Sequence, residues 1–230
     1  DTLFTTTASI DTLKQTILQL AVMGKLVPQN PNDEPAAKLL ERIAAEKAQL
    51  IKDKKIKKQK PLPEITDEEN PFELPQGWEW GRLGDLSSDI HYGYTASAKH
   101  NSDGVRLLRI TDIQDDKVDW STVPACEITI QKAQNYLLEN DDILIARTGG
   151  TIGKSYLVEN IDLEAVFASY LIRVRRVNYM YSPFIKVYLG SHLYWRQLYD
   201  NASGTVVTDS VGNHNGAGSQ NSSLFSSTGR

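Results

Sequence analysis

The sequence predicts a mixed α/β (α+β) fold, in which a globular domain with a twisted sheet is joined to a long α-helical hairpin or coiled-coil spacer. Apolar residues recur at helical spacing through the first 60 residues, whereas short β-branched and aromatic runs follow between residues 105 and 174. We therefore predict a helical region at 1–70, a globular domain at 71–208 and a tail at 209–230. Prolines mark the border between the first two, at Pro61, Pro63, Pro71 and Pro75.

Two helices are expected in the first region. Ser9 is a good N-cap for the first helix, and Gly24 can end it in the left-handed conformation. Asp33 is expected to cap the second helix, which has Pro35 in its first turn and should run to about Lys58. The apolar stripes are narrow, so the hairpin is expected to need another surface to pack against. The stripes include Leu13, Ile17 and Leu20 in the first helix, and Leu39, Ile43 and Leu50 in the second.

The globular region should contain short strands and a later helix. Four runs have strand character: Val105–Ile110, Asp142–Ala146, Ser155–Val158 and Ser169–Val174. Helical spacing returns over Pro183–Tyr199. Asp209–Arg230 is mostly Ser, Gly, Asn and Thr, and it has too few apolar side chains to fold independently. We expect this last stretch to be a disordered tail outside the fold.

Composition excludes several classes of protein. The chain has 230 residues and a formal net charge of −4, so it is not a uniformly basic nucleic-acid-binding protein. Cys126 is the only cysteine, which excludes an internal disulfide and a Cys-rich zinc site. No apolar run approaches the roughly 20 residues of a membrane span, and the first residues do not resemble a signal peptide. We expect a cytoplasmic protein without a membrane partner.

The segment Thr148–Ser155 resembles a phosphate-binding P-loop, because Gly153, Lys154 and Ser155 stand in the right order after a predicted strand. However, Thr148 replaces the first glycine of that motif. The residues that follow have strand character, whereas a P-loop must open a helix whose N-terminus faces the phosphate. A tight β-turn is the simpler interpretation. A third is a loop in which Arg147 and Lys154 face DNA phosphates.

Other catalytic and metal-binding patterns are weak, so we expect a noncatalytic protein without a metal or a cofactor. The four histidines are scattered, and none stands four residues from another as in a helical metal pair. Cys126 has no evident histidine partner, which favours a buried structural thiol over a nucleophile. Asp141 and Asp142 precede a strand, but no Glu-x-Lys follows to complete a nuclease site.

The densest local charge is a lysine run at the end of the second predicted helix: Lys52, Lys54, Lys55, Lys57, Lys58 and Lys60. Such a run is usually a solvated helix end that the helix dipole favours, and the alternative is a contact with phosphate or an acidic partner. Two loops carry the side chains that read base edges: His91–His100, and Arg109–Gln114 with its Arg, Thr and Gln. Ordinary loop polarity would explain the same composition.

The order of several motifs resembles the type I restriction–modification DNA specificity subunits. Leu13–Val27, Asp33–Ala36 and Leu39–Ile43 are similar to the helical segment of that family. Leu74–Trp80, together with Arg82–Asp85, resembles the start of a target recognition domain of that family. Further matches within such a domain are Leu107–Ile113, Asp142–Gly149, Gly153–Lys154, Ala168–Arg173 and Ala202–Thr205. The resemblance runs from about Leu13 to Val207.

The resemblance implies a noncatalytic subunit that reads double-stranded DNA. In that family two target recognition domains each read one half of a bipartite target, methyltransferase subunits dock against the helices, and restriction subunits join them. This sequence has one such domain, which suggests a half subunit able to self-associate head to tail. The helical stripe residues named above would then bind the partner.

Residue type and placement select the expected DNA contacts. Arg147 and Lys154 should position phosphates, while Gln114 or Arg109 could read bases. The full set is Tyr92, Tyr94, Thr95, Lys99, His100, Arg109, Gln114, Arg147, Thr148, Thr151 and Lys154. Two alternatives stay open: a P-loop-like nucleotide-binding enzyme that uses Gly153–Ser155, and a pure partner-binding scaffold.

Overall fold

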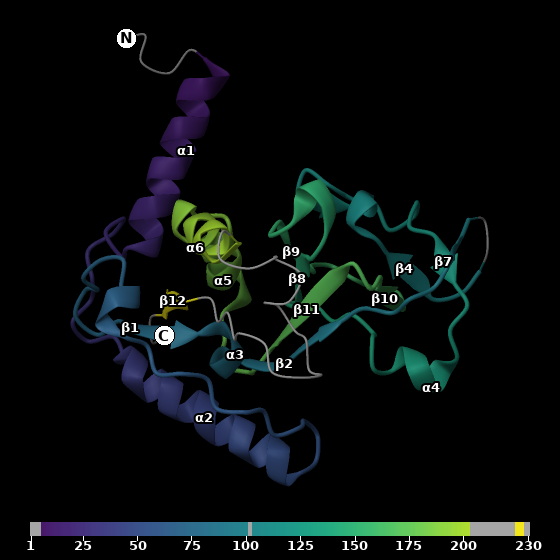
Figure 1. The fold of residues 1–230 in the computed structure, drawn as a ribbon, viewed down its shortest axis with the longest axis horizontal. Helices are drawn as coiled ribbons and strands as arrows, with labels where there is room; N and C mark the ends of the chain where they lie inside the picture. Colours follow the sequence, from purple (N-terminus) through teal and green to yellow (C-terminus); the bar gives the residue numbers. More distant parts are fainter. Residues whose placement is uncertain (1–5, 101–102, 203–223, 228–230) are drawn as a thin grey trace.

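The computed structural model describes residues 6–100, 103–202 and 224–227. It confirms the mixed helix-and-sheet class (Figure 1). Its helices are α1 (Thr7–Val22), α2 (Ala36–Lys52), α3 (Leu83–Leu86), α4 (Ile130–Ala133), α5 (Ser182–Leu189) and α6 (His192–Ala202), with 3-10 turns η1 (Asp67–Glu69), η2 (Ile110–Asp112) and η3 (Gly149–Thr151). Its strands are β1 (Glu79–Arg82), β2 (Ser87–Tyr92), β3 (Ala98–Lys99), β4 (Arg106–Leu108), β5 (Ile113–Gln114), β6 (Lys117–Val118), β7 (Ala125–Cys126), β8 (Ile143–Ala146), β9 (Ser155–Leu157), β10 (Ala165–Phe167), β11 (Leu171–Arg176) and β12 (Leu224–Ser227). No helix in the described part of the chain is long and apolar enough to span a bilayer.

Helix α1 begins three residues earlier than the sequence suggests. Thr6 is the N-cap, and its hydroxyl accepts a hydrogen bond from the Ser9 amide at 3.2 Å. Ser9 completes a capping box with Thr6, so it lies in the first turn and is not the cap itself. Gly24 follows the last turn with φ 67°, which confirms the predicted end of this helix.

Helix α2 ends at Lys52, and the prediction that it continues to about Lys58 is wrong. Lys54 takes φ 57°, and the Lys55 amide donates back to the Leu50 carbonyl at 2.9 Å. The apolar stripe that holds the helix to the domain stops at Ile51, and four polar residues follow it. Without a buried face, further turns have no tertiary packing to stabilise them. At the other end, Pro35 occupies the N-cap position expected for Asp33.

The two helices lean on the globular part at different places. In Figure 1, α1 projects away beside α5 and α6, whereas α2 runs along the opposite side past β1 and α3. Leu39 and Ile43 of α2 are buried together with Leu83 and Leu86. Val22, at the end of α1, belongs to the same core cluster. The helical region and the sheet therefore share one hydrophobic core.

Two four-stranded sheets form the centre of the molecule. The first is antiparallel with the order β2-β11-β8-β9. Strands β8 and β11 lie at its middle; β8 and the first four residues of β11 are buried, as expected for strands covered on both faces. The second has the order β10-β4-β7-β3 and contains a parallel pair, β10 with β4. The four predicted strands correspond to β4, β8, β9 and β11.

The C-terminal part differs from the prediction in two ways. The single helix expected over Pro183–Tyr199 is divided by Gly190 and Ser191 into α5 and α6. Within the expected tail, Leu224–Ser227 forms β12 and pairs antiparallel with β1, because Glu79–Arg82 offers an edge with unpaired backbone groups. The motif residues 203–207 and the rest of the tail lie outside the described residues.

Candidate nucleic-acid interface

Tyr92 and Arg147 meet at one end of the first sheet. Tyr92 is the last residue of β2 and stands opposite Ile172 of β11, while Arg147 directly follows β8 on the other side of β11. The Arg147 amide donates to the Tyr170 carbonyl at 3.0 Å, which continues the strand register past β8. The Arg147 guanidinium carbon lies 4.2 Å from the centre of the Tyr92 ring. This cation–π contact holds an arginine at the sheet end in a defined orientation.

Gly93 joins this end of the first sheet to the second sheet. A side chain at Gly93 would place its Cβ 2.2 Å from the Phe167 carbonyl oxygen and 2.3 Å from that of Ala168. The close approach lets the Tyr94 amide donate to the Phe167 carbonyl at 2.7 Å. The Ser169 amide donates back to the Tyr94 carbonyl at 3.1 Å. Only glycine fits such a backbone crossing without displacing a strand.

A buried polar network lies directly behind Tyr92. Arg173 of β11 is 1% exposed and forms an ion pair with Asp142 at 3.5 Å. One Arg173 nitrogen donates to His91 Nε2 at 2.7 Å, so His91 carries its proton on Nδ1 and donates to the Tyr92 carbonyl at 2.9 Å. Arg173 also donates to the carbonyls of Asn135 and Leu137. The network ties the end of β2 to the loop that follows α4.

Burial sets the protonation of this network. Burial lowers the pKa of His91, and the nearby Arg173 charge lowers it further, against the opposing effects of the Tyr92 carbonyl and Asp89. Burial also raises the pKa of Asp142 and lowers that of Arg173, whereas their mutual attraction acts in the opposite direction for each. An arginine stays charged in proteins, so the ion pair with Asp142 compensates for its desolvation.

Arg109 and Gln114 lie beside the second sheet and are held by their own turn. Arg109 follows β4, whose carboxyl end lies beside that of the parallel strand β10. Its guanidinium donates to both carboxylate oxygens of Asp112, at 3.0 and 2.7 Å, and this contact raises the pKa of Arg109. The Gln114 amide donates to the Thr111 carbonyl at 2.8 Å. Both side chains are thus engaged locally, which weakens the expectation that they read bases.

The other predicted contacts are dispersed. Lys99 belongs to β3 at the edge of the second sheet and forms an ion pair with Glu127, and exposed His100 follows it. Exposed Thr95 lies just after Tyr94, whereas Thr148, Thr151 and exposed Lys154 belong to the loop after β8. The structure therefore brings Tyr92 and Arg147 into contact at the ends of β2 and β8, with Tyr94 two residues after Tyr92 and Thr148 directly after Arg147 in the chain. We call this group, with exposed Tyr170, the sheet-end site.

The loop from Thr148 to Ser155 is a packed turn and not a P-loop. The residues after it form strand β9, so the loop does not open a helix as a P-loop must. Gly153 has φ 83°, and a Cβ there would lie 2.3 Å from Leu198 of α6. The Ser155 hydroxyl lies 3.3 Å from Lys186 Nζ, which also donates to the Ser155 carbonyl at 2.6 Å. The glycines therefore serve turn geometry and packing against α6.

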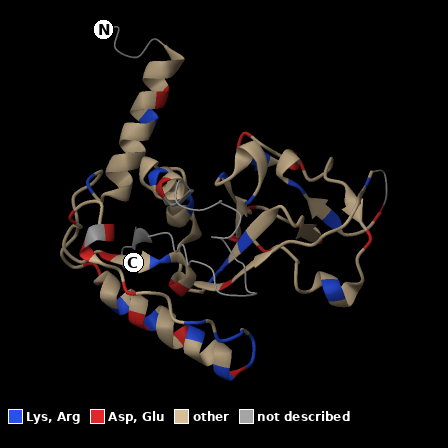
Figure 2. Cartoon of the chain, viewed as in Figure 1, with Lys and Arg blue, Asp and Glu red and all other residues tan. Residues whose placement is uncertain are grey.

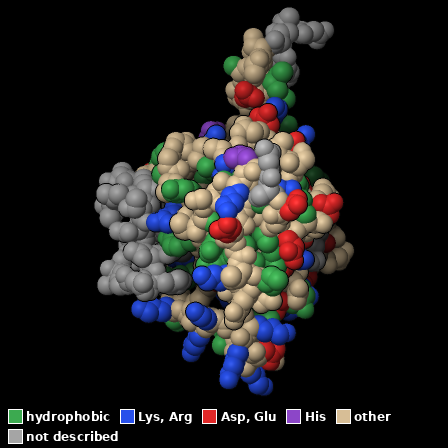
Figure 3. All heavy atoms as spheres, turned by 90° about the vertical axis from the view of Figure 1, so that its right-hand side faces the viewer, with side chains coloured by type: hydrophobic (Ala, Val, Ile, Leu, Met, Phe, Trp, Pro, Cys, Tyr) green, Lys and Arg blue, Asp and Glu red, His purple; other side chains and the backbone are tan. Residues whose placement is uncertain are grey.

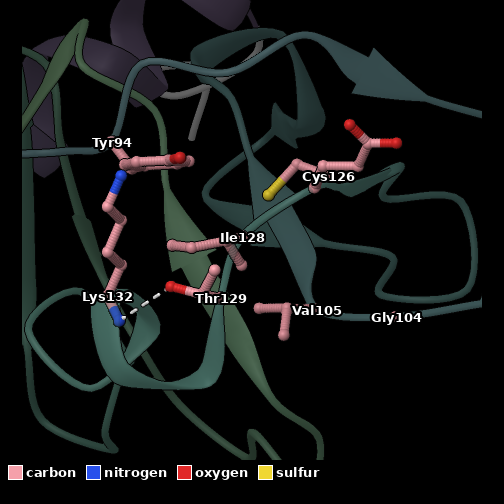
Figure 4. Close-up of a pocket in the computed structure, with 8 residues that line it drawn as sticks. Tyr94, Gly104, Val105, Cys126, Ile128, Thr129 and Lys132 are labelled. Carbon is pink, nitrogen blue, oxygen red and sulfur yellow. Dashed lines mark hydrogen bonds between the residues drawn. The ribbon is translucent and has the colours of Figure 1, made fainter.

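A shallow hollow of about 420 Å³ lies next to Tyr94 (Figure 4). Tyr94 and Lys132 line one side and Cys126 the other, with Ile128 between them. Cys126 is buried, as expected, and this burial raises the pKa of its thiol. Among the described residues, no group of three or more His, Cys, Asp and Glu side chains is placed to hold a metal ion.

Sequence reasoning missed the buried residues that support the sheet-end site. Arg173 lies in the strand predicted from its apolar neighbours, and a charged residue within a buried strand is the available signal of an internal partner. Asp142, which precedes a predicted strand, is the buried partner of Arg173. Tyr136, whose ring centre lies 5.7 Å from that of His91 and 5.5 Å from that of Tyr94, had no local signal.

Leu39 and Ile43, two of the residues expected to bind a partner, do not lie on the surface of this chain. Both are buried in the core of this chain, at 6% and 2% exposure. Leu50 is half-buried. By contrast, Leu13, Ile17 and Leu20 of α1 are among the exposed large apolar residues, together with Ile10. The helical face that stays accessible therefore belongs to α1.

Comparison with known proteins identifies the family. No protein-family profile matches the chain. The type I restriction enzyme EcoAI specificity subunit of Escherichia coli is 47% identical over 200 residues, which cover 84% of this chain and 34% of that protein. The EcoEI specificity subunit of the same species is 44% identical over 187 residues, covering 77% and 31%. The chain thus spans about a third of the length of these curated relatives.

Similar solved structures include the HsdS subunit from Thermoanaerobacter tengcongensis, at 15% identity and a TM-score of 0.47 over 96% of this chain and 45% of that one. Another is the type I restriction–modification system S subunit from M. genitalium, at 11% identity and a TM-score of 0.42 over 96% and 48%. The sequence relationship carries the assignment: the matching part of this chain belongs to the type I restriction enzyme specificity subunits.

Proposed function

We propose that this chain is a noncatalytic, sequence-specific DNA-recognition module that reads one half of a bipartite target through the sheet-end site. The observation that carries the proposal is the arrangement of Arg147. Its guanidinium is stacked on Tyr92, and its Nε is buried without a hydrogen-bond partner. No carboxylate of the described residues forms an ion pair with it, in contrast to Arg109 and Lys99. An oriented arginine without a competing anion can bind the N7 and O6 acceptors of guanine or a phosphate.

The family relationship supports this proposal, because the relatives are specificity subunits. Within residues 71–208 the sheet-end site combines arginine, tyrosine and threonine side chains, which suit contacts with bases and phosphates. Lys154 and Thr151 would contribute phosphate contacts from the neighbouring loop. Arg109 and Gln114 would first have to leave their partners in the η2 turn.

We further propose that methyltransferase subunits dock against the exposed face of α1. Ile10, Leu13, Ile17 and Leu20 line this face, and a row of exposed apolar residues on a helix favours a partner helix. A restriction subunit would join the complex, and a second copy of the chain would supply the other half-site. Such a protein works where chromosomal DNA lies, in the cytoplasm of a bacterium.

Selection from randomised duplexes tests the recognition proposal. The chain together with its methyltransferase partner should enrich one short half-site. Arg147→Ala should relax the preference at one or two positions, at about 1–3 kcal/mol for each lost bidentate contact. Arg176→Ala is the matched control, because Arg176 lies at the other end of β11 and pairs with Asp141 at 3.4 Å. It should leave the selected sequence unchanged.

Two outcomes would favour other functions. A complex that enriches no sequence would contradict the recognition proposal. A complex that assembles normally, but whose DNA affinity is unchanged by Arg147→Ala, would indicate a scaffold. The nucleotide-binding alternative lacks support, because a strand follows the glycine loop.

A further inference from the structure

Six lysines lie within nine residues at the end of α2: Lys52, Lys54, Lys55, Lys57, Lys58 and Lys60. All six are exposed, and none forms an ion pair with a described residue. Asp53 is the single acidic residue between Glu46 and Glu64, and its carboxylate accepts a hydrogen bond from Gln49. We call this segment, residues 52–60, the lysine turn. Figure 2 shows its positive charges along the loop after α2, and in Figure 3 lysine and arginine side chains gather at the lower end of the molecule.

Most arginines elsewhere in the described structure form ion pairs with carboxylates. Buried or half-buried arginines pair with carboxylates in Arg82–Glu69, Arg109–Asp112, Arg173–Asp142 and Arg175–Glu139. Lys186 pairs with Asp116 at 2.9 Å. The chain as a whole is acidic, with a formal net charge of −4. The lysine turn is therefore a local concentration of positive charge without an ion-pair partner among the described residues, on a protein that is acidic as a whole.

Stabilisation of helix α2 does not account for the position of these lysines. A helix dipole favours cations in the last turn only, and α2 ends at Lys52. Five of the six lysines lie beyond that end. The chain reverses at Lys54, and the Lys55 amide is fixed to the Leu50 carbonyl, so the following lysines are presented from a defined turn. Ile56 is half-buried, which leaves its lysine neighbours on the solvent side.

The chemistry of the turn selects its partner. Protein interfaces are built around aromatic and aliphatic side chains and are depleted in lysine, and the turn exposes no such anchor. Lysine acts as a strongly hydrated point charge with little demand on geometry. The regularly spaced phosphates of a nucleic-acid backbone can pair with these lysines whatever the base sequence and whatever the position along the duplex. A polyanionic backbone fits the turn better than an acidic protein surface.

We infer that the lysine turn binds the phosphate backbone of duplex DNA outside the bases read by the sheet-end site. This inference extends the proposed function, because it adds a sequence-independent contact on the helical region to the sequence-dependent contact on the globular domain. Each lysine that neutralises a phosphate releases a condensed counterion. The contact therefore contributes affinity at low salt and leaves discrimination between sequences unaltered.

The test measures the salt dependence of DNA binding. The 230-residue chain is titrated with a labelled random-sequence duplex by fluorescence anisotropy, from low to physiological ionic strength. In the test variant Lys55, Lys57 and Lys58 are changed to Gln, and Lys54 is kept because of its left-handed backbone. The slope of log affinity against log salt should become shallower by about 2–3, and affinity at low salt should fall on the order of tenfold.

The control changes Lys25, Lys38 and Lys117 to Gln, which removes the same net charge from exposed positions elsewhere. Its slope should stay close to that of the unsubstituted chain, and thermal melting should show that both variants fold. Equal slopes for the test variant and the unsubstituted chain would overturn the inference. So would normal DNA binding accompanied by loss of the methyltransferase partner, which would indicate an acidic protein surface. Because a random duplex is used, the result is independent of whether the chain has a sequence preference.

Discussion

The geometry of the sheet-end site depends on Gly93, the residue between Tyr92 and Tyr94 at which the backbone crosses the neighbouring segment. Gly93→Ala should destabilise the fold by more than about 2 kcal/mol, because the new methyl group would overlap two backbone carbonyls of the neighbouring segment. Chemical denaturation measures this loss. Gly150→Ala is the matched control, since a Cβ at Gly150 meets no atom within 4 Å. Equal stability of the two variants would contradict the crossing described above.

His91 makes stability depend on pH. Its pKa is lowered in the native state, mainly by burial, so below about pH 6.5 the unfolded chain takes up a proton that the folded chain excludes. The free energy of unfolding should therefore fall as pH decreases through this range. His91→Gln, whose amide can keep hydrogen bonds to Arg173 and the Tyr92 carbonyl, should flatten this dependence in thermal melts between about pH 7.5 and 5.5.

The raised pKa of Asp142 has the opposite sign, because the native chain binds that proton more readily than the unfolded chain. Protonation of Asp142 favours the folded state as pH falls through the pKa of its carboxyl in the native chain. This contribution is present both in the unsubstituted chain and in the His91→Gln variant. The comparison of the two chains therefore isolates the histidine. An identical loss of stability in both would show that His91 does not carry the effect.

At the scale of elements, α1 and α2 should respond differently to the same substitution. Ile43→Ala on α2 removes a buried side chain and should cost about 2–5 kcal/mol of stability. Ile17→Ala on α1 removes a side chain that is 44% exposed and should change stability by less than about 1 kcal/mol. If α1 is the docking helix, Ile17→Ala should nevertheless weaken co-purification of the methyltransferase subunit. Unchanged assembly would remove the role proposed for α1.

The elements also show which parts of the fold a sequence can predict. Strands β8 and β11 were predictable from short runs of apolar and β-branched side chains, which are uninterrupted in β8 and broken by Arg173 in β11. The pairing of β4 with β10 could not be predicted, because three-residue strands far apart in the chain leave no periodic signal in the sequence. Arg147 could be chosen from its residue type, but its stacking on Tyr92 depends on strand order. The buried pair Arg173–Asp142 is equally a product of tertiary contact.

At the scale of the whole molecule, the net charge of −4 predicts weak binding to DNA by the isolated chain at physiological ionic strength. The sheet-end site and the lysine turn are small positive regions on an acidic surface, and long-range attraction to a polyanion is correspondingly limited. Adding the methyltransferase subunit should raise affinity by supplying most sequence-independent contacts. Tight binding of the chain alone at that ionic strength would contradict this expectation.

The core that Val22, Leu39 and Ile43 share with Leu83 and Leu86 determines how new specificities could be engineered. A chimera joined between Pro61 and Pro75 would place the helices of one parent against the globular domain of another. Unless the residues on both sides of that contact came from the same parent, the hybrid would begin with mismatched side-chain volumes. Exchange of the globular domain should therefore succeed when the buried α2 residues Leu39 and Ile43 are taken from the same parent as that domain.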